Sequence, residues 1–268
     1  MRSRHALLLV LPALALGAAG CGVRREPAAG GAFPLTTTDS GGAVVRLTAR
    51  PVRIACLVGY ACRTLGALGV KATPATVGTL AALAPDLVVA PREADGTVVR
   101  GAAPHAVVYV FGGSDPAAAA SAIAGLGLAV GEGARGIQIA RTVGAGVTAA
   151  LAAARRGQPR RVFVNPAELV ADGPETPAGR LVTLAGGTNV VGRSAAIGFA
   201  ALRADRAEVW LVGPGSATTL ATLRASALTK AVPAVVAGRV ATLDPADFEP
   251  SPDLPKALDA LVALVRSP

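Results

Sequence analysis

Residues 133–156, GARGIQIARTVGAGVTAALAAARR, decide how this chain is organised. The stretch has no strand signal, and its apolar residues recur at helical spacing, at Ile137, Ala140, Val143, Val147 and Leu151. Gly157-Gln158-Pro159 ends the pattern, and a strand pattern follows at once. A helix of about 20 residues spans about 30 Å, which is long for an ordinary crossover. We therefore expect a linker helix over 133–157 between two α/β lobes, or else one larger sheet covered by a long helix.

Apolar runs of strand length alternate with Ala/Leu-rich helical patterns on both sides of this segment. Strands are expected at Val44–Leu47, Val52–Val58, Leu87–Ala90, Val107–Phe111, Arg161–Val164, Val209–Val212 and Arg239–Leu243. Helices are expected at Ala61–Leu68, Thr79–Leu83 and Ala117–Leu126. Short, fully apolar strands between helices indicate parallel sheets covered on both faces. The expected fold class is α/β, with an N-terminal lobe over 43–132 and a C-terminal lobe over 158–268.

The N-terminus has the pattern of a secretory signal. Arg2 and Arg4 precede an apolar run from Ala6 to Ala19, which is too short to cross a bilayer as a helix. The ending Ala18-Ala19-Gly20-Cys21 resembles a bacterial lipoprotein signal, in which the cysteine is lipidated; the alternative is an ordinary cleaved signal. We expect a signal peptide over 1–20, a lipid-anchored Cys21 with a flexible tether over 21–42, and an extracytoplasmic location at the cell membrane.

Composition excludes several function classes. Once Arg2 and Arg4 leave with the signal, 24 basic residues face 17 acidic ones, but the arginines are scattered, so charge does not identify a ligand or a nucleic-acid partner. His105 is the only histidine after the signal, which argues against a multi-histidine metal site. The chain has no G-x-S-x-G elbow and no P-loop. We expect no enzyme activity, no cofactor and no resident metal.

Two cysteines remain after Cys21. Cys56 and Cys62 are six positions apart. In an oxidising compartment they form either a local disulfide or two buried thiols, and the sequence leaves both open.

Several segments occur in a specific order along the chain. They are Phe33-Pro34-Leu35-Thr36-Thr37-Thr38-Asp39, Gly42–Leu47, Pro51–Ile54, Leu65–Gly69, Ala84–Ala90, Ala185–Val190, Asp247-Phe248 and Ser251-Pro252. In this order the chain resembles the substrate-binding lipoproteins of ABC importers for ferric siderophores, haem and cobalamin, over nearly all of 33–268. The resemblance implies two Rossmann-like lobes joined by a single long helix, with a ligand cleft between them. It also implies a monomer that delivers a small-molecule metal chelate to an ABC permease dimer.

Two departures from that family pattern concern docking and cleft size. The resembling family carries a permease-docking glutamate in each lobe, but here the first position holds Arg63 and the second falls at or near Ala200. The second lobe offers Asp205 and Glu208 as candidate substitutes, and the first helix offers none. The chain also runs almost directly from Gly69 to Thr79, where the family has a second strand and a longer loop. We expect a smaller first lobe, and docking to a permease stays open.

Strand ends should face the cleft, because open α/β sheets bind ligands beyond the carboxyl ends of their strands. The candidate ligand-binding residues are Tyr60, Arg63, Arg92, Glu93, Gly112, Asn165, Glu168, Arg193, Pro214, Asp247 and Phe248. Arg63 and Arg92 are expected to neutralise an anionic ligand, or else are simply solvated. Tyr60 and Phe248 are expected to stack on a ring, or Phe248 caps the core, while Trp210 is expected in the core.

The leading expectation is a lipid-anchored receptor for a ferric siderophore or related iron chelate, with cobalamin or haem as alternative ligands. The other reading is a diverged paralogue that acts as an envelope scaffold or sensor without permease docking.

Overall fold

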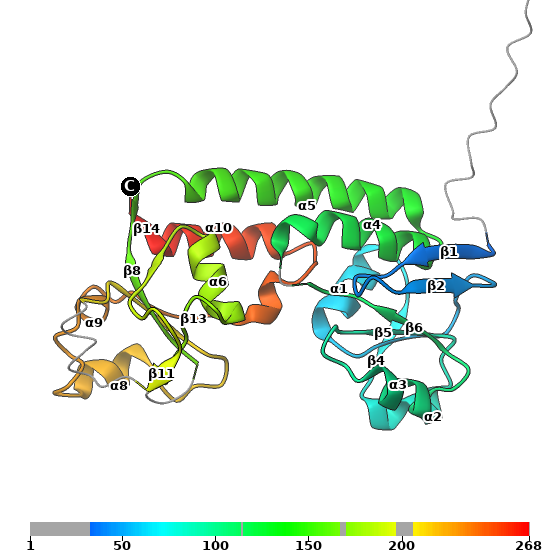
Figure 1. Ribbon diagram of the computed structural model, residues 1–268, viewed down its shortest axis with the longest axis horizontal. Helices are drawn as coiled ribbons and strands as arrows, with labels where there is room; N and C mark the ends of the chain where they lie inside the picture. The colour runs from blue at the N-terminus through cyan, green and yellow to red at the C-terminus, as the bar shows by residue number, and fades with distance from the viewer. Residues whose placement is uncertain (1–32, 114, 167–169, 197–205, 268) are drawn as a thin grey trace, which may run out of the picture.

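The computed structural model describes residues 33–113, 115–166, 170–196 and 206–267. These residues form two separate four-stranded parallel sheets, one in each lobe. Helix α5 (Gly133–Ala154) runs along both lobes (Figure 1). The α/β fold with two lobes and a long linking helix is thereby confirmed, and the alternative of one larger sheet is wrong.

The N-terminal sheet has the strand order β4-β3-β5-β6, and all of its neighbouring strands pair in parallel. Its strands are β3 (Ile54–Cys56), β4 (Ala72–Pro74), β5 (Leu87–Ala90) and β6 (Val107–Val110). Its helices are α1 (Gly59–Ala67), η1 (Val77–Thr79), α2 (Leu80–Leu83), α3 (Gly96–Ala102), η2 (Pro116–Ala118) and α4 (Ala119–Ala129). The short 69–79 segment was expected to lack the second strand of the resembling family. This expectation is corrected, because the three-residue edge strand β4 pairs with β3 there.

An antiparallel hairpin stands beside this sheet. It consists of β1 (Leu35–Thr38) and β2 (Val44–Leu47). Strand β1 lies inside 21–42, which the sequence assigned to the tether. The correction has a simple cause: β1 pairs residue by residue with β2, whose Val45 and Leu47 are buried in the core.

The C-terminal sheet has the order β10-β8-β12-β13 and is also parallel. Its strands are β8 (Arg161–Asn165), β10 (Thr188–Asn189), β12 (Val209–Val212) and β13 (Val240–Thr242), and two short ribbons pair β9 (Val170–Ala171) with β11 (Ala195–Ala196) and β7 (Gln158–Pro159) with β14 (Arg266–Ser267). Its helices are α6 (Pro177–Leu184), α8 (Leu220–Ala225), α9 (Pro233–Val236), η3 (Pro245–Phe248) and α10 (Leu254–Val265).

Each sheet buries both faces because successive strand residues point to opposite sides. Leu87 and Val89 of β5 join a large core cluster that continues through α5 and α10, whereas Val88 joins a separate cluster on the outer face. In β12, Trp210 faces the outer cluster and meets Phe163 edge-on, with ring centroids 5.0 Å apart. Trp210 is 2 % exposed, as the sequence predicts for a core residue.

Helix α5 is held by close backbone contact with α4 on one lobe and by contact with α10 on the other. A Cβ at Gly127 of α4 would lie 2.8 Å from the Cα of Gly136, and a Cβ at Gly146 would lie 2.6 Å from the Cβ of Pro255. By length and composition alone α5 could cross a membrane, but α4 and α10 cover one side of it (Figure 1). Of the apolar residues that mark the helical period, Ile137 is 43 % exposed, whereas Ala140, Val143 and Val147 are buried.

Candidate functional site

A cavity of about 530 Å³ lies between the two lobes and is called the inter-lobe cavity below. Its N-terminal wall follows the carboxyl ends of β3 and β5, and it consists of Val58, Tyr60, Pro91, Arg92, Glu93 and Gly113. Its C-terminal wall comes from the start of α6 and from η3 with the residue after it, and it consists of Glu175, Pro177, Arg180, Pro245, Ala246 and Glu249. The position agrees with the expectation that strand ends face the cleft.

Tyr60 reaches the cavity from the first turn of α1 and is 6 % exposed. Its hydroxyl donates to the carbonyl oxygen of Phe111 at 3.2 Å. Burial raises the pKa of the Tyr60 phenol, and the nearby carboxylates of Glu249 and Glu93 raise it further. Tyr60 therefore enters the cavity as a neutral hydroxyl that is already bonded to the backbone.

Gly112 brings two of these groups together. It has a φ of +141°, and a Cβ there would lie 2.8 Å from the Tyr60 hydroxyl and 2.9 Å from Oε2 of Glu249. Both oxygens thus occupy the space beside Gly112 that a side chain would take. The predicted role of Gly112 is indirect, because its lack of a side chain lets these two groups approach.

Glu249 is a cavity residue that the sequence did not identify. The backbone N–H of Gly113 donates to its Oε2 at 2.6 Å, so a residue of the C-terminal lobe is held against the N-terminal lobe. Burial raises the pKa of the Glu249 carboxyl and the neighbouring Glu93 raises it as well, while the Gly113 hydrogen bond and Arg92 act in the opposite direction. The only signal in the chain is its place directly after the Asp247-Phe248 motif.

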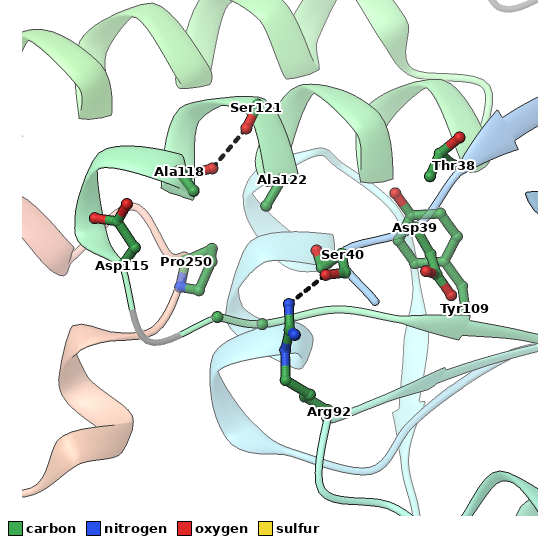
Figure 2. Close-up of a pocket in the computed structure, with 12 residues that line it drawn as sticks. Thr38, Asp39, Ser40, Arg92, Tyr109, Asp115, Ala118, Ser121, Ala122 and Pro250 are labelled. Atoms are coloured by element: carbon green, nitrogen blue, oxygen red, sulfur yellow. Dashed lines mark hydrogen bonds between the residues drawn. The ribbon is translucent and has the colours of Figure 1, made fainter. Parts of the chain in front are cut away.

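Arg92 lines the inter-lobe cavity and also a second cavity of about 450 Å³, the side cavity. Its guanidinium donates to the carbonyl oxygen of Ser40, so in Figure 2 the side chain extends toward the loop after β1. The side cavity lies under α4 and contains the buried Tyr109 and Asp39, whose carboxylate accepts backbone N–H groups of Gly41, Ala43 and Val110.

The C-terminal wall carries one acidic and one basic side chain, those of Glu175 and Arg180. Glu175 accepts a hydrogen bond from the backbone N–H of Ser194 at 2.6 Å, which lowers the pKa of that carboxyl, and Arg193 lowers it further. Arg180 of α6 lines the same wall. The predicted residue Arg193 is therefore beside a cavity residue rather than part of the cavity lining, and Glu175 and Arg180 were missed.

Arg63 lies outside the inter-lobe cavity. Its Nε is 3.4 Å from Oδ2 of Asp253, at the start of α10. The next residue, Thr64, is fully buried, and its hydroxyl donates to the carbonyl of Pro250 at 3.1 Å. Position 63 therefore belongs to the contact between α1 and the segment that leads into α10, which corrects its expected place in the cleft.

The other predicted residues are placed as follows. Asn165 is 3 % exposed and its amide donates to the carbonyl of Val170, so it supports the chain beyond β8. Phe248 is buried in the main core, as the alternative of a core cap expected. Its ring is therefore not available to stack on a ligand. Pro214 and Asp247 are exposed and do not line the cavity. Cys21, Glu168 and Ala200 lie outside the described residues.

Cys56 and Cys62 are joined by a disulfide that links β3 to α1. The bond closes a short loop that carries Val58 and Tyr60, two residues of the cavity wall. Within the described ranges, no three or more His, Cys, Asp or Glu side chains form a group that could hold a metal ion.

Comparison with known proteins shows which folds this structure resembles. No family model matches the chain, and no curated protein matches it. Among solved structures, the periplasmic haem-binding protein BhuT in complex with two haems is 23 % identical, with a TM-score of 0.67, over 81 % of this chain and 98 % of BhuT.

Two more structures agree. The apo form of the periplasmic haem-binding protein RhuT from Roseiflexus sp. RS-1 is 20 % identical (TM-score 0.64, 80 % of this chain and 97 % of that one). A protein of the ABC-type Fe3+-hydroxamate transport system from Saccharomonospora viridis is 18 % identical (TM-score 0.60, 86 % of this chain and 98 % of that one). The chain therefore has the two-lobe α/β fold of periplasmic solute-binding proteins.

Proposed function

We propose that this chain is an extracytoplasmic, lipid-anchored receptor of an ABC importer that holds a ferric siderophore or related iron chelate between its lobes. The observation that carries the proposal is the inter-lobe cavity of about 530 Å³, which is lined by residues of both lobes and lies at the carboxyl ends of the N-terminal lobe's parallel strands. Its volume falls in the usual range of small-molecule sites, about 300–1,000 Å³. The frame is also that of proteins named for haem binding and for Fe3+-hydroxamate transport.

The lining favours a chelate with a polar shell over a flat ring system. Tyr60 is the aromatic side chain among the cavity residues, and its hydroxyl is bonded to the Phe111 carbonyl. Phe248, the other aromatic candidate, is buried in the core. A haem or a corrin would gain little from stacking here, whereas carboxylate, guanidinium and backbone groups suit the hydrogen-bonding oxygens and nitrogens of a siderophore.

The anchor and the partner follow from the N-terminal sequence. Cys21 precedes β1 by a short segment, so a lipid on this residue would keep both lobes at the membrane surface, where an importer's permease dimer would receive the ligand. Binding as a monomer suits this role, because both walls of the cavity come from one chain.

One observation supports a second candidate function. Arg63 stands where the resembling family has a docking glutamate, and it pairs with the chain's own Asp253. A permease arginine would meet a cation at this position, which is unfavourable. The alternative is a diverged receptor that serves as an envelope scaffold or sensor. Co-purification of the full chain with a permease from its own membranes would contradict this alternative.

The test of ligand binding uses thermal unfolding and calorimetry of the mature chain with three probes: a ferric trihydroxamate, haem and cobalamin. A ligand present at 100 times its Kd stabilises the folded state by about 2.7 kcal/mol, so binding raises the Tm. We expect the ferric trihydroxamate to raise the Tm and its iron-free form to have a smaller effect.

Matched variants locate the site. Arg180→Ala removes a cation from the cavity wall, whereas Arg141→Ala changes an exposed residue of α5 that does not line the cavity. We expect weaker binding only in Arg180→Ala. If none of the three probes binds, or if both variants bind like the parent chain, the proposed site or ligand class is wrong.

A further inference from the structure

The inter-lobe cavity does not have the cationic lining that an anionic ligand requires. Its charged residues are Arg92, Arg180, Glu93, Glu175 and Glu249, so three carboxylates face two guanidiniums. The charges are also unevenly placed, because Glu249 of the C-terminal wall is hydrogen-bonded to Gly113 of the N-terminal wall, and the N-terminal wall also carries Glu93. This excess of negative charge indicates what charge a ligand should carry, which the fold alone does not indicate.

The position of Glu249 is imposed by its surroundings. Its Oε2 accepts the hydrogen bond from the Gly113 N–H at 2.6 Å, and the same oxygen lies against Gly112 beside the Tyr60 hydroxyl. A carboxylate held by the backbone in this way cannot turn away from the cavity without losing that bond. Glu93 belongs to the N-terminal wall that Glu249 contacts, two residues after the proline that follows β5.

Neither carboxylate forms an ion pair within the described residues. Arg92 is the nearest cation on this wall, and its guanidinium is bonded to the Ser40 carbonyl at the side cavity (Figure 2). On the C-terminal wall, Glu175 and Arg180 both line the cavity and Arg193 lowers the pKa of Glu175, so this side has no unmatched carboxylate. Two like charges thus lie near each other on this side of the cavity, and each raises the free energy of the other.

A positive group between them would remove this repulsion. A protonated amine has three N–H donors in a compact head, and each carboxylate has oxygens left to accept them. Such a group would form charge-assisted hydrogen bonds inside a partly enclosed space, where they are stronger than at an open surface.

The geometry points to a ligand that carries a cationic ammonium arm, with Glu93 and Glu249 as the residues that bind the arm. This inference rests on the proposed function, because it concerns the charge of the chelate that the same cavity would hold. It replaces the expectation that Arg63 and Arg92 neutralise an anionic ligand, since Arg63 lies outside the cavity and pairs with Asp253.

The experiment uses one ferric complex in three charge forms. The parent is a linear ferric trihydroxamate with a free, protonated amine; the second has this amine acetylated and is neutral; the third has it succinylated and is anionic. The iron-binding part is identical in all three. Calorimetry with the mature chain gives a Kd for each.

We expect the ammonium form to bind at least about tenfold tighter than the acetylated form and the succinylated form to bind weakest. Equal affinities for the three forms, or tightest binding of the succinylated form, would overturn the inference while leaving chelate binding intact. If none of the forms binds, the proposed function itself fails and the inference fails with it.

Two variants assign the preference to residues. In Glu93→Gln/Glu249→Gln we expect the affinity ratio between the ammonium and acetylated forms to fall to within about threefold, because Gln keeps the size and an acceptor oxygen but not the charge. The control is Asp259→Asn on the exposed side of α10, which removes one negative charge away from the cavity and should leave the ratio unchanged. A ratio that persists in the double variant would refute the assignment.

Discussion

The close contact between α4 and α5 gives the sharpest test of the architecture. We predict that Gly127→Ala destabilises the protein although alanine is the better helix former. A Cβ at position 127 would lie 2.8 Å from the Cα and 3.3 Å from the backbone nitrogen of Gly136, and 3.2 Å from the carbonyl oxygen of Glu132. All three atoms are backbone, so no side chain can rotate to make room.

The magnitude follows from two opposing contributions. Replacing a helical glycine by alanine gains about 1 kcal/mol where space allows. Forcing an extra methyl group into a tightly packed interface costs about 1–3 kcal/mol, and the upper value applies here because two helix backbones must separate. The expected net loss is about 2 kcal/mol, equivalent to a fall in Tm of about 4–8 °C for a chain of this size.

Gly66→Ala in α1 is the matched control. Gly66 is exposed, and a Cβ there would meet no atom within 4 Å. This variant should therefore show only the propensity gain, about 1 kcal/mol. Urea unfolding of both variants and the parent chain measures the difference. If Gly127→Ala proves as stable as Gly66→Ala, the helices do not approach as described and the reasoning fails.

Two further predictions concern the walls of the inter-lobe cavity. Replacing Cys56 and Cys62 by serine should lower the free energy of unfolding by about 2 kcal/mol, because the disulfide between residues six apart restricts the unfolded chain. Reductant should lower the urea midpoint of the parent chain but not that of the double variant. An unchanged midpoint of the parent chain would contradict this prediction. Because burial raises the folded-state pKa of Glu249 above its ordinary value of 4.5, its contribution to stability is present below that value and is lost as the pH rises through the raised pKa. Glu249→Gln should therefore gain stability relative to the parent chain between pH 4.5 and pH 7, and parallel pH profiles of the two proteins would count against a raised pKa.

Much of the fold could be predicted from local pattern. The strands at Leu87–Ala90 and Val209–Val212 were predicted with the bounds that the structure has, because short apolar runs between helices are typical of buried parallel strands. Helix α5 was predicted from its helical period. Strand β1, with the sequence LTTT, has no such signal, since it is stabilised by pairing with β2 rather than by its own burial.

The candidate site could be predicted only in part. Tyr60, Arg92 and Glu93 follow strand ends, and topology alone places such residues at the cleft. Glu249 and Arg180 reach the cavity from helical segments of the other lobe, and no local pattern marks them. Arg63 also follows a strand end, yet it faces Asp253 because α1 turns this side toward the start of α10.

The sequence by itself determined the α/β class of the fold and the long helix, because periodicity and strand length are properties of neighbouring residues, whereas the division into two separate sheets was decided by the tertiary structure. Only the tertiary structure decided which charges share the inter-lobe cavity. Glu93 and Glu249 are far apart in the chain, and the hydrogen bond from the Gly113 N–H holds Glu249 against the N-terminal wall, which carries Glu93. Electrostatic interactions depend on distance in space, and that distance is set by how the two lobes are joined.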